Sequence, residues 1–596
     1  MSLFEAVSRE AIYLGAIGRT LFRLRHVKPD SPHTVNEIFE DVAARKPRNT
    51  AVLFEERVLT YEDLSQGANR YAHWALAQGL RKGDVVALFM ESRPEYLMAW
   101  LGLVKLGAVV ALINTNLRGA ALAHCITIAE AKLAVVGSEL AAAYVEAMAD
   151  AGTKPAPWIT GGPVHGGEDL DAALAEASSM PVDIAVRQGL VAKDNAFYIY
   201  TSGTTGLPKA ARFSHMRMLY MMYGFAGALD TRESDRIYDT LPLYHSTGGV
   251  CAVGMALTVG GALVIRRKFS VHAFWQDCRR YDITVFQYIG ELCRYLLNAP
   301  PGPHERDHRI RAITGNGLRP EIWDAFQKRF AIPRIVEFYG ATEGNVSMLN
   351  YDGKPGAVGR IPWYMRGLIK TRIVRFDVES EMPVRGADGF CIECADGETG
   401  EALGAVDDEA GRRFEGYTHS ADSEKKLLRD VFEKGDVWYR TGDLMRRDAH
   451  GYFTFVDRIG DTFRWKGENV STGEVAGVLE SVPEIAEANV YGVGVPGQDG
   501  RAGMAALVVA PGFDAQSLGA ALAGKLPAYA RPLFLRLRPE MEITGTFKQR
   551  KVDLVRDGFD PAHVADPLYW FDAQNGRYQS LDAARYRDIV EGRVKL

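Results

Sequence analysis

The chain has 596 residues, 47% hydrophobic and 24% charged, which is the composition of a globular protein with several domains. The net charge of −5 argues against a generally basic surface, so we expect no nucleic-acid partner, and any anion site has to be built locally. Six cysteines are too few for a disulfide framework and indicate a reducing, cytoplasmic environment.

The first 33 residues are expected to form an amphipathic segment ahead of the folded domains. Apolar side chains recur near helical spacing, and basic side chains follow them. Such a helix either lies on an anionic membrane at its inner face or packs on its own domain, and the sequence leaves both alternatives open. The apolar positions are Phe4, Val7, Ala11, Leu14 and Leu21, and the basic ones are Arg19, Arg23, Arg25 and Lys28.

From about residue 34 to residue 311, apolar strands alternate with helical patterns. Residues 84–90, DVVALFM, predict a buried strand, and Ser92 with Glu95 predicts a capping box that opens the next helix. Residues 96–113 and 248–265 approach the length of a membrane span, but glycine breaks followed by β-branched runs favour a helix and then a strand. The alternation predicts an α/β fold with doubly wound parallel sheets.

The composition changes twice toward the C-terminus. Residues 353–452 are rich in Gly, Asp and Glu with short alternating strands, which predicts a smaller β-rich subdomain. After Arg458, a helical pattern at 474–480 and strands at 487–495 and 503–510 predict a compact α+β unit.

The most informative stretch is residues 198–214, YIYTSGTTGLPKAARFS. A strand ends in hydroxyls and glycines, and one lysine follows, so backbone N–H groups, hydroxyls and an ammonium can surround a polyphosphate. The spacing is not that of a Walker loop, and a flexible surface loop is the ordinary alternative. The candidate phosphate-binding residues are Thr201, Ser202, Gly203, Thr204, Thr205 and Lys209.

Two further motifs carry suitable chemistry. In FYGATEGN, residues 338–345, Tyr339 can stack on a purine, Thr342 can donate to a phosphate and Glu343 can hold Mg²⁺. In YRTGD, residues 439–443, Asp443 can accept hydrogen bonds from both ribose hydroxyls. The alternatives are an exposed acid in a turn and a common Asx turn.

In this order, the three motifs resemble those of the adenylate-forming superfamily, which includes acyl-CoA synthetases and luciferases, over residues 34–553. The stretches LINTNLR (112–118), QYIGELCRYLLN (287–298), GNGLRP (315–320) and DRIGDTFRWKGENVST (457–472) resemble the fatty acid transport protein and very-long-chain acyl-CoA synthetase branch. The resemblance implies an adenylation domain at 34–458 and a mobile C-terminal domain at 459–596. It also implies two half-reactions: a fatty carboxylate and ATP form acyl-AMP, and coenzyme A then displaces AMP.

The resemblance also assigns roles to individual residues. Adenine would face Gly315, Asn316, Gly317 and Tyr339, with Gly340 and Ala341 alongside, and ribose would face Asp443 and Arg458. Thr342 would contact phosphate, and Glu343 would hold Mg²⁺. His245 would lie near the acyl and CoA entrances and Gly467 along the pantetheine tunnel, while Lys548 would bridge the carboxylate and the α-phosphate.

Two positions depart from the wider superfamily. The hinge position usually holds Asp or Lys, whereas this chain has Gly460 followed by Asp461. Thr546 and Phe547 separate Gly545 from Lys548, so the choice of Lys548 over Lys551 rests on the branch resemblance.

The leading interpretation is a ligase that uses ATP, Mg²⁺ and coenzyme A to activate a long- or very-long-chain fatty acid, with uptake following from trapping of the acid. The alternatives are a ligase for bile or steroid side-chain acids, an acyl-AMP ligase that loads a carrier protein, and a membrane fatty acid transporter.

Overall fold

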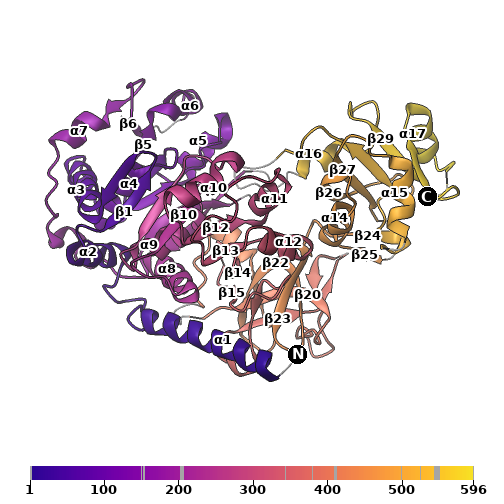
Figure 1. Ribbon diagram of the computed structural model, residues 1–596, viewed down its shortest axis with the longest axis horizontal. Coiled ribbons are helices and arrows are strands. Elements are labelled where there is room, and N and C mark those ends of the chain that lie inside the picture. The colour runs from indigo at the N-terminus through magenta and orange to yellow at the C-terminus, as the bar shows by residue number, and fades with distance from the viewer. Residues whose placement is uncertain are drawn as a thin grey trace.

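The computed structural model describes residues 3–149, 151, 155–201, 207–342, 344–378, 380–407, 412–466, 468–498, 500–523, 525–542, 551–594 and 596 (Figure 1). The described residues form two large, mostly parallel sheets, a smaller antiparallel sheet and a separate C-terminal sheet. The structure is thus a mixed α/β fold with a large N-terminal part and a small C-terminal part, as the sequence predicts.

The first large sheet carries most of the candidate site. Its order is β15-β14-β13-β12-β10-β11-β1-β2, and the pairs between β14 and β1 are all parallel. Its strands are β1 (Thr50–Phe54), β2 (Arg57–Thr60), β10 (Arg236–Asp239), β11 (Ala262–Ile265), β12 (Val285–Ile289), β13 (Ala312–Asn316), β14 (Ile335–Gly340) and β15 (Ser347–Asn350).

The second large sheet has the order β7-β6-β5-β3-β4-β8-β9 and ends in the antiparallel hairpin of β8 and β9. Its strands are β3 (Val85–Phe89), β4 (Val109–Leu112), β5 (Leu133–Gly137), β6 (Ala156–Thr160), β7 (Glu168–Asp169), β8 (Asn195–Thr201) and β9 (Lys209–Ser214).

Helices separate and cover these two sheets. One core between the sheets joins Val110 and Phe197 of the second sheet to Ile237 and Val336 of the first through apolar helices. Residues of both sheets and of these helices are buried because each element is apolar on the faces it presents. The inner helices are α2 (Val35–Arg45), α3 (Tyr61–Ala77), α4 (Pro94–Lys105), α8 (His215–Leu229) and α9 (Val253–Leu257); the outer ones are α5 (Gly119–Ile128), α6 (Ala141–Ala147), α10 (Val271–Arg280), α11 (Gly290–Asn298) and α12 (Pro320–Arg329).

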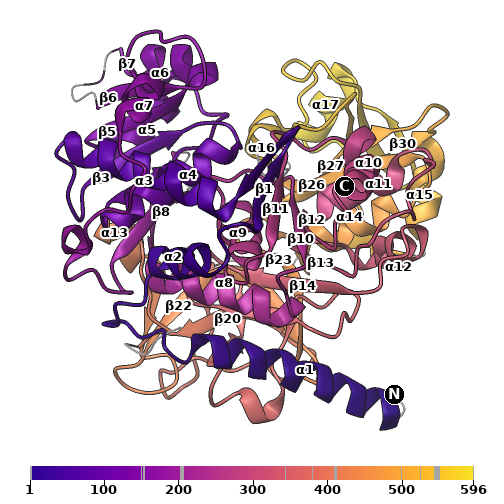
Figure 2. The same cartoon turned by 60° about the vertical axis from the view of Figure 1, so that its left-hand side comes forward.

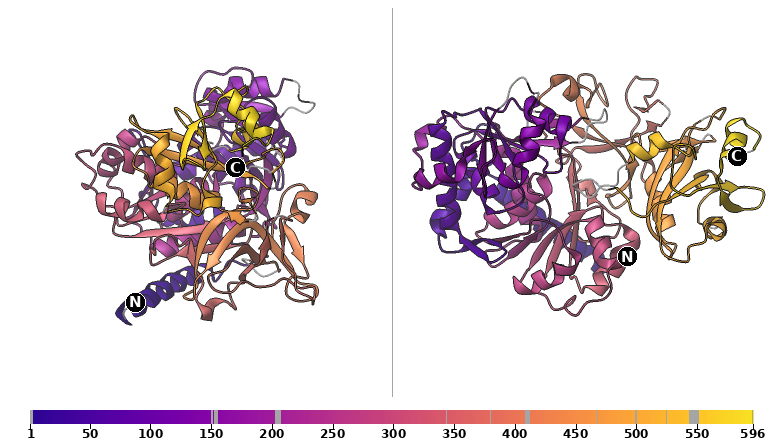
Figure 3. Two further views of the ribbon diagram at one scale, coloured as in Figure 1. Left: turned by 90° about the vertical axis from the view of Figure 1, so that its right-hand side faces the viewer. Right: turned by 90° about the horizontal axis from the view of Figure 1, so that it is seen from above.

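The β-rich region and the C-terminal unit follow as the sequence predicts. The antiparallel sheet contains β16 (Gly359–Arg360), β17 (Thr371–Val374), β20 (Thr399–Ala405), β21 (Leu427–Arg429), β22 (Val437–Arg447) and β23 (Tyr452–Arg458). The C-terminal sheet contains β26 (Ile485–Val493), β27 (Ala502–Val509), β28 (Phe534–Leu537), β29 (Leu568–Asp572) and β30 (Arg577–Ser580), with α14 (Thr472–Glu480), α15 (Ala515–Ala523), α16 (Val552–Asp557) and α17 (Ala583–Val590). Figure 3 shows this unit standing apart from the two large sheets.

The N-terminal segment forms helix α1 (Leu3–Leu24), which packs lengthwise on α8 (Figure 2). Tyr13 and Ala16 are fully buried in this contact, and Gly227 of α8 allows the close approach because a Cβ there would lie 2.3 Å from the Thr20 hydroxyl oxygen. Packing on its own domain is therefore one role of the helix. The predicted apolar row of Val7, Leu14 and Leu21 faces away from this contact and is 61%, 54% and 49% exposed.

One local prediction was wrong. Ser92 does not cap α4, because Arg93 is the residue before the first helical position, Pro94. Glu95 is then one position too early for a capping box, and the Ser92 hydroxyl instead accepts a hydrogen bond from the Leu243 N–H at 3.3 Å. Both long apolar segments do form a helix and then a strand, α4–β4 and α9–β11. No helix in the described part of the chain is both long and apolar enough to cross a membrane.

Candidate active site

A wall of bare backbone lies at the carboxyl end of β13. Gly315 and Asn316 end this strand, and Gly317 follows with a φ of +83°. A Cβ on Gly315 would lie 2.2 Å from the Tyr288 carbonyl oxygen, and one on Gly290 would lie 1.7 Å from that of Gly317. Only glycine fits this close packing of the strand ends, and the contact of residues 315–317 with adenine stays a prediction.

Glu337 on β14 supports this wall from inside the protein. Its carboxylate accepts hydrogen bonds from the Leu318 N–H at 3.0 Å and from the Tyr288 hydroxyl. The side chain is only 2% exposed, and this burial raises the pKa of Glu337 to about 8. Sequence reasoning missed Glu337; the available signal was one acid inside the otherwise apolar strand IVEFYG.

The structure brings together three predicted residues that are far apart in sequence. The Tyr339 hydroxyl, from β14, donates a hydrogen bond to Asp443 on β22. Asp443 pairs in register with Arg458 of β23, and Arg458 Nε lies 3.8 Å from the Asp443 carboxylate. Burial and the negative charge of Asp443 raise the pKa of Tyr339 well above its usual range. An aromatic ring, a carboxylate and a guanidinium thus meet at the end of β14, the strand next to the glycine wall. These groups can hold a nucleoside.

The predicted phosphate loop connects β8 and β9. Thr201 and Lys209 are cross-strand partners at the two ends of that connection. Lys209 Nζ lies 2.8 Å from the Asp422 carboxylate and 5.7 Å from the centre of the Tyr417 ring. The hydrogen bond from Lys209 holds the pKa of Asp422 below its usual range. Sequence reasoning missed Asp422, with which a phosphate would compete for the ammonium.

Residues 340–342 connect this hairpin to the nucleoside side of the site. The Ala341 carbonyl accepts a hydrogen bond of 2.6 Å from Arg217, which lies on α8 directly after β9. Gly340 ends β14 and is exposed, and Thr342 follows at the same edge of the sheet. The FYGATEGN segment therefore contacts the YRTGD motif through Asp443 and the helix that follows the β8–β9 hairpin through Arg217.

His245 lies in the loop that leads from β10 into the helical turns before α9. Its ring centre is 5.0 Å from that of Tyr244, and its carbonyl accepts a 2.7 Å hydrogen bond from the Gly249 N–H. The Tyr244 hydroxyl accepts a hydrogen bond of 3.3 Å from Asn116. The motifs around residues 112–118 and 241–249 are therefore neighbours in the fold.

Several predicted residues lie outside the described residues, and their roles stay predictions: Ser202, Gly203, Thr204, Thr205, Glu343, Gly467 and Lys548. The alternative lysine is described: Lys551 Nζ contacts the Asp461 carboxylate at 3.1 Å and the Thr472 hydroxyl at 2.8 Å. Lys551 is thus held beside the predicted hinge, and the choice of Lys548 stays a prediction. Among the described residues, no group of three or more His, Cys, Asp or Glu side chains is placed to hold a metal ion.

Comparison with known proteins identifies the relatives of this chain. The AMP-binding enzyme family model matches residues 39–400, and the model of the AMP-binding enzyme C-terminal domain matches residues 474–548. The chain is 43% identical to mouse (Mus musculus) long-chain fatty acid transport protein 6, covering 94% of this chain and 91% of that protein. It is equally identical to human (Homo sapiens) long-chain fatty acid transport protein 1, covering 99% and 93%.

Solved structures show the same fold. An anthranilate CoA ligase in complex with anthranoyl-AMP superposes with a TM-score of 0.75 at 21% identity, covering 88% of this chain and 96% of that one. A Mycobacterium tuberculosis fatty acyl CoA synthetase superposes with a TM-score of 0.60 at 22% identity, covering 88% and 98%. The family model matches more than half of the chain and the curated relatives match nearly all of it, so the chain belongs to the AMP-binding enzyme family and, within it, to the long-chain fatty acid transport proteins.

Proposed function

We propose that the protein joins a long-chain fatty acid to coenzyme A at the expense of ATP, through an acyl-AMP intermediate. The observation that carries this proposal is the meeting of Tyr339, Asp443 and Arg458 next to the glycine wall of residues 315–317. This set suits an adenosine, and the 43% identity to proteins named for long-chain fatty acids supports the class of acid.

In the first half-reaction, a carboxylate oxygen attacks the α-phosphorus of ATP and pyrophosphate leaves. We assign Lys548 to the space between the two anions, where its positive charge lowers their repulsion and stabilises the charge that develops at phosphorus. Lys209 and the hydroxyls of the residue 201–205 loop would hold the β- and γ-phosphates. We assign Thr342 to the phosphates and Glu343 to Mg²⁺, whose charge would neutralise the leaving pyrophosphate.

In the second half-reaction, the thiol of coenzyme A attacks the acyl carbon and AMP leaves. We propose that residues 459–596 rotate between the two steps about Gly460. β23 ends at Arg458, the C-terminal core begins at Phe463, and Gly460 between them has a φ of +91°. The contacts across the two parts include Arg294 to the Ala486 carbonyl at 2.9 Å and the ion pair of Arg319 with Glu480. Polar contacts of this kind can break and reform.

The experiment that tests the reaction is pyrophosphate release from ATP across a panel of carboxylic acids, with and without coenzyme A and Mg²⁺. We expect release with fatty acids of long chain and formation of the CoA thioester when coenzyme A is present. Faster turnover with a bile acid would favour the steroid acid alternative. Acyl-AMP formation without transfer to coenzyme A would favour a carrier-loading ligase, and no pyrophosphate release with any acid would reject the proposal.

A further inference from the structure

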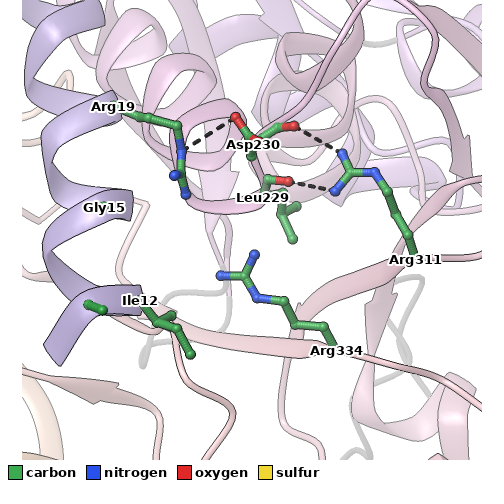
Figure 4. A pocket seen from close by; sticks show the side chains of 8 residues that line it. Ile12, Gly15, Arg19, Leu229, Asp230, Arg311 and Arg334 are labelled. Carbon is green, nitrogen blue, oxygen red and sulfur yellow. Dashed lines mark hydrogen bonds and ion pairs between the residues drawn. The ribbon is translucent and has the colours of Figure 1, made fainter. Parts of the chain in front are cut away.

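A cavity of about 370 Å³ lies beneath α1, at the edge of the first sheet where β13 and β14 begin. Arg311 and Arg334 are the residues immediately before these two parallel strands, and Arg19 faces them from α1. Figure 4 shows the three guanidinium groups converging from separate elements, with that of Arg334 pointing toward Leu229 and Arg19. The remaining lining residues are Ala11, Ile12, Gly15, Leu229 and Asp230.

The end of α8 holds these arginines in place. Successive carbonyls at its C-terminus accept hydrogen bonds: Gly227 from Arg19 Nε at 2.9 Å, Ala228 from Arg334 Nη2 at 3.0 Å and Leu229 from Arg311 Nη1 at 2.8 Å. Capping of a helix C-terminus by cations is a sufficient reason for one arginine. Capping alone does not use all the N–H donors of the three arginines.

The donors that remain differ between the arginines. Arg311 is fully engaged, because it also contacts the Asp235 carboxylate at 2.9 and 2.6 Å. Within the described residues, Arg334 donates hydrogen bonds only through Nη2, to two carbonyls, and forms no ion pair. Arg19 donates a hydrogen bond only through Nε, and this atom lies 3.5 Å from the Asp230 carboxylate. The outer nitrogens of Arg19 and Arg334 can therefore donate to a ligand in the cavity.

Positive charge is in excess around this cavity. Asp230 is shared between Arg19 and Arg232, Asp235 is engaged by Arg311, and Arg23 adds a further charge beside Thr231. Among the described residues, five arginines thus stand against three aspartates: Asp230 and Asp235, which pair with three of them, and Asp352, whose charge also acts on Arg334. Burial, together with the charges of Arg19 and Arg311, lowers the pKa of Arg334, so an anion in the cavity would relieve the repulsion.

An exposed apolar strip adjoins the cavity on α1. Val7, Leu14 and Leu21 lie one above another at intervals of seven residues, and Phe22 next to them is 66% exposed. Ala11 lies between this strip and the cavity and belongs to both. An anion site bordered by apolar side chains fits a ligand that combines a phosphate with acyl chains.

We propose that the arginine cavity and the apolar strip of α1 together bind an anionic phospholipid at a membrane surface, with the headgroup phosphate between Arg19 and Arg334 and the strip in the acyl boundary. A free phosphate would use the arginines but would leave the strip in water, which is why the lipid is the occupant that accounts for both features. The site lies at the opposite edge of the sheet from the candidate active site, so lipid binding is independent of the proposed reaction and can be measured without turnover.

The experiment is cosedimentation of the full chain with vesicles of phosphatidylcholine alone or mixed with phosphatidylglycerol. We expect binding to the anionic vesicles, a loss of binding at high salt, and about tenfold weaker binding for Arg334→Gln and for Arg19→Gln. Arg309→Gln is the matched control: it removes the same charge two residues from Arg311, and Arg309 is 75% exposed outside the cavity. This control should bind within about twofold of the unmodified protein.

Arg19→Gln guards against misfolding, because it removes fewer hydrogen bonds than Arg334→Gln. Leu14→Ser tests the strip and should weaken vesicle binding while leaving the cavity intact. The proposal is overturned if the protein binds both kinds of vesicle equally, or if both arginine variants bind as tightly as Arg309→Gln. It is also overturned if inorganic phosphate raises the thermal midpoint in an Arg334-dependent way while anionic vesicles fail to bind, since the occupant is then a free anion.

Discussion

The two ends of β13 and β14 present opposite chemistry. At the carboxyl ends stand the glycine wall of residues 315–317 and Tyr339, with an acid buried behind them. At the amino ends stand Arg311 and Arg334, held by the carbonyls of α8 beneath α1. Three residues of β13 separate Arg311 from Gly315 and four residues of β14 separate Arg334 from Tyr339, which is about 13–17 Å along the strands.

This difference follows from how a parallel sheet is built. Every parallel strand enters at one edge and leaves at the other, so the two edges collect different loops, and the strands between them are mostly apolar on both faces. One edge can then evolve a mobile catalytic arrangement while the other keeps a fixed binding surface. Changes at either edge should leave the other intact, and the predictions below test that separation.

The largest expected effect belongs to Lys548→Ala. We expect acyl-AMP formation from free acid and ATP to fall by about 10²–10³-fold, because one cation between two anions is lost. Thioester formation from synthetic acyl-AMP should be largely spared, and vesicle binding should be unchanged. Assays of the two half-reactions on one preparation check this; equal loss of both would remove Lys548 from its assigned role.

Gly460→Pro should separate the two half-reactions. Gly460 has a φ of +91° in this structure, whereas proline fixes φ near −65°, so the variant cannot adopt the arrangement described here. We expect the rates of acyl-AMP formation and of thioester formation to change by factors that differ about tenfold or more. Unchanged rates in both assays would place the pivot elsewhere, with Asp461 as the next candidate.

Glu337→Gln should change how stability depends on pH. Burial raises the pKa of Glu337 to about 8, so the folded protein keeps this proton at neutral pH, while the unfolded chain loses it above the ordinary value of 4.5. The stabilisation that this bound proton gives the folded state is complete below the ordinary glutamate pKa of 4.5 and is lost as the pH rises through about 8.

Glutamine has no proton to lose, so the free energy of unfolding should fall less with rising pH in the variant, by on the order of 1–3 kcal/mol between about pH 5 and 8. Urea unfolding at both pH values measures this. The exposed Glu176→Gln should behave like the unmodified protein. Parallel pH dependence of the Glu337 variant and this control would show that Glu337 is ionised in the fold.

The smallest effect is expected in the arginine cavity at the amino ends of β13 and β14. Gly15 lines the cavity, and a Cβ there would meet only Arg19 Nη1, at an ordinary 3.5 Å. Gly15→Glu places a carboxylate next to the arginines, and Gly15→Gln is its neutral match with similar helix propensity. The Glu variant should melt roughly 1–2 °C higher than the Gln variant at low salt, and the difference should vanish at high salt. Equal midpoints at low salt would argue against an excess of positive charge in the cavity.

The local elements and the motifs could be read from the sequence. Glycine breaks identified the helix–strand pairs at 96–113 and 248–265, and hydroxyl-rich and glycine-rich strand ends marked the segments that we expect to face a nucleotide. Such features depend on neighbours a few residues away, and short-range backbone preferences decide them. The same reasoning failed at Ser92, because a shift of one residue in the start of α4 removes the capping box.

Only the tertiary structure decided which side chains meet. The contacts of Tyr339 with Asp443 and of Lys209 with Asp422 join residues that lie in different sheets or in distant loops, and the arginine cavity joins α1, the end of α8 and the starts of two strands. Strand order is not encoded in local spacing. In chain order β11 comes between β10 and β12, but in the sheet β10 lies between β11 and β12. Burial of Glu337 and exposure of Val7, Leu14 and Leu21 are likewise set by what packs against each face, and an amphipathic pattern alone does not say which neighbour will cover it.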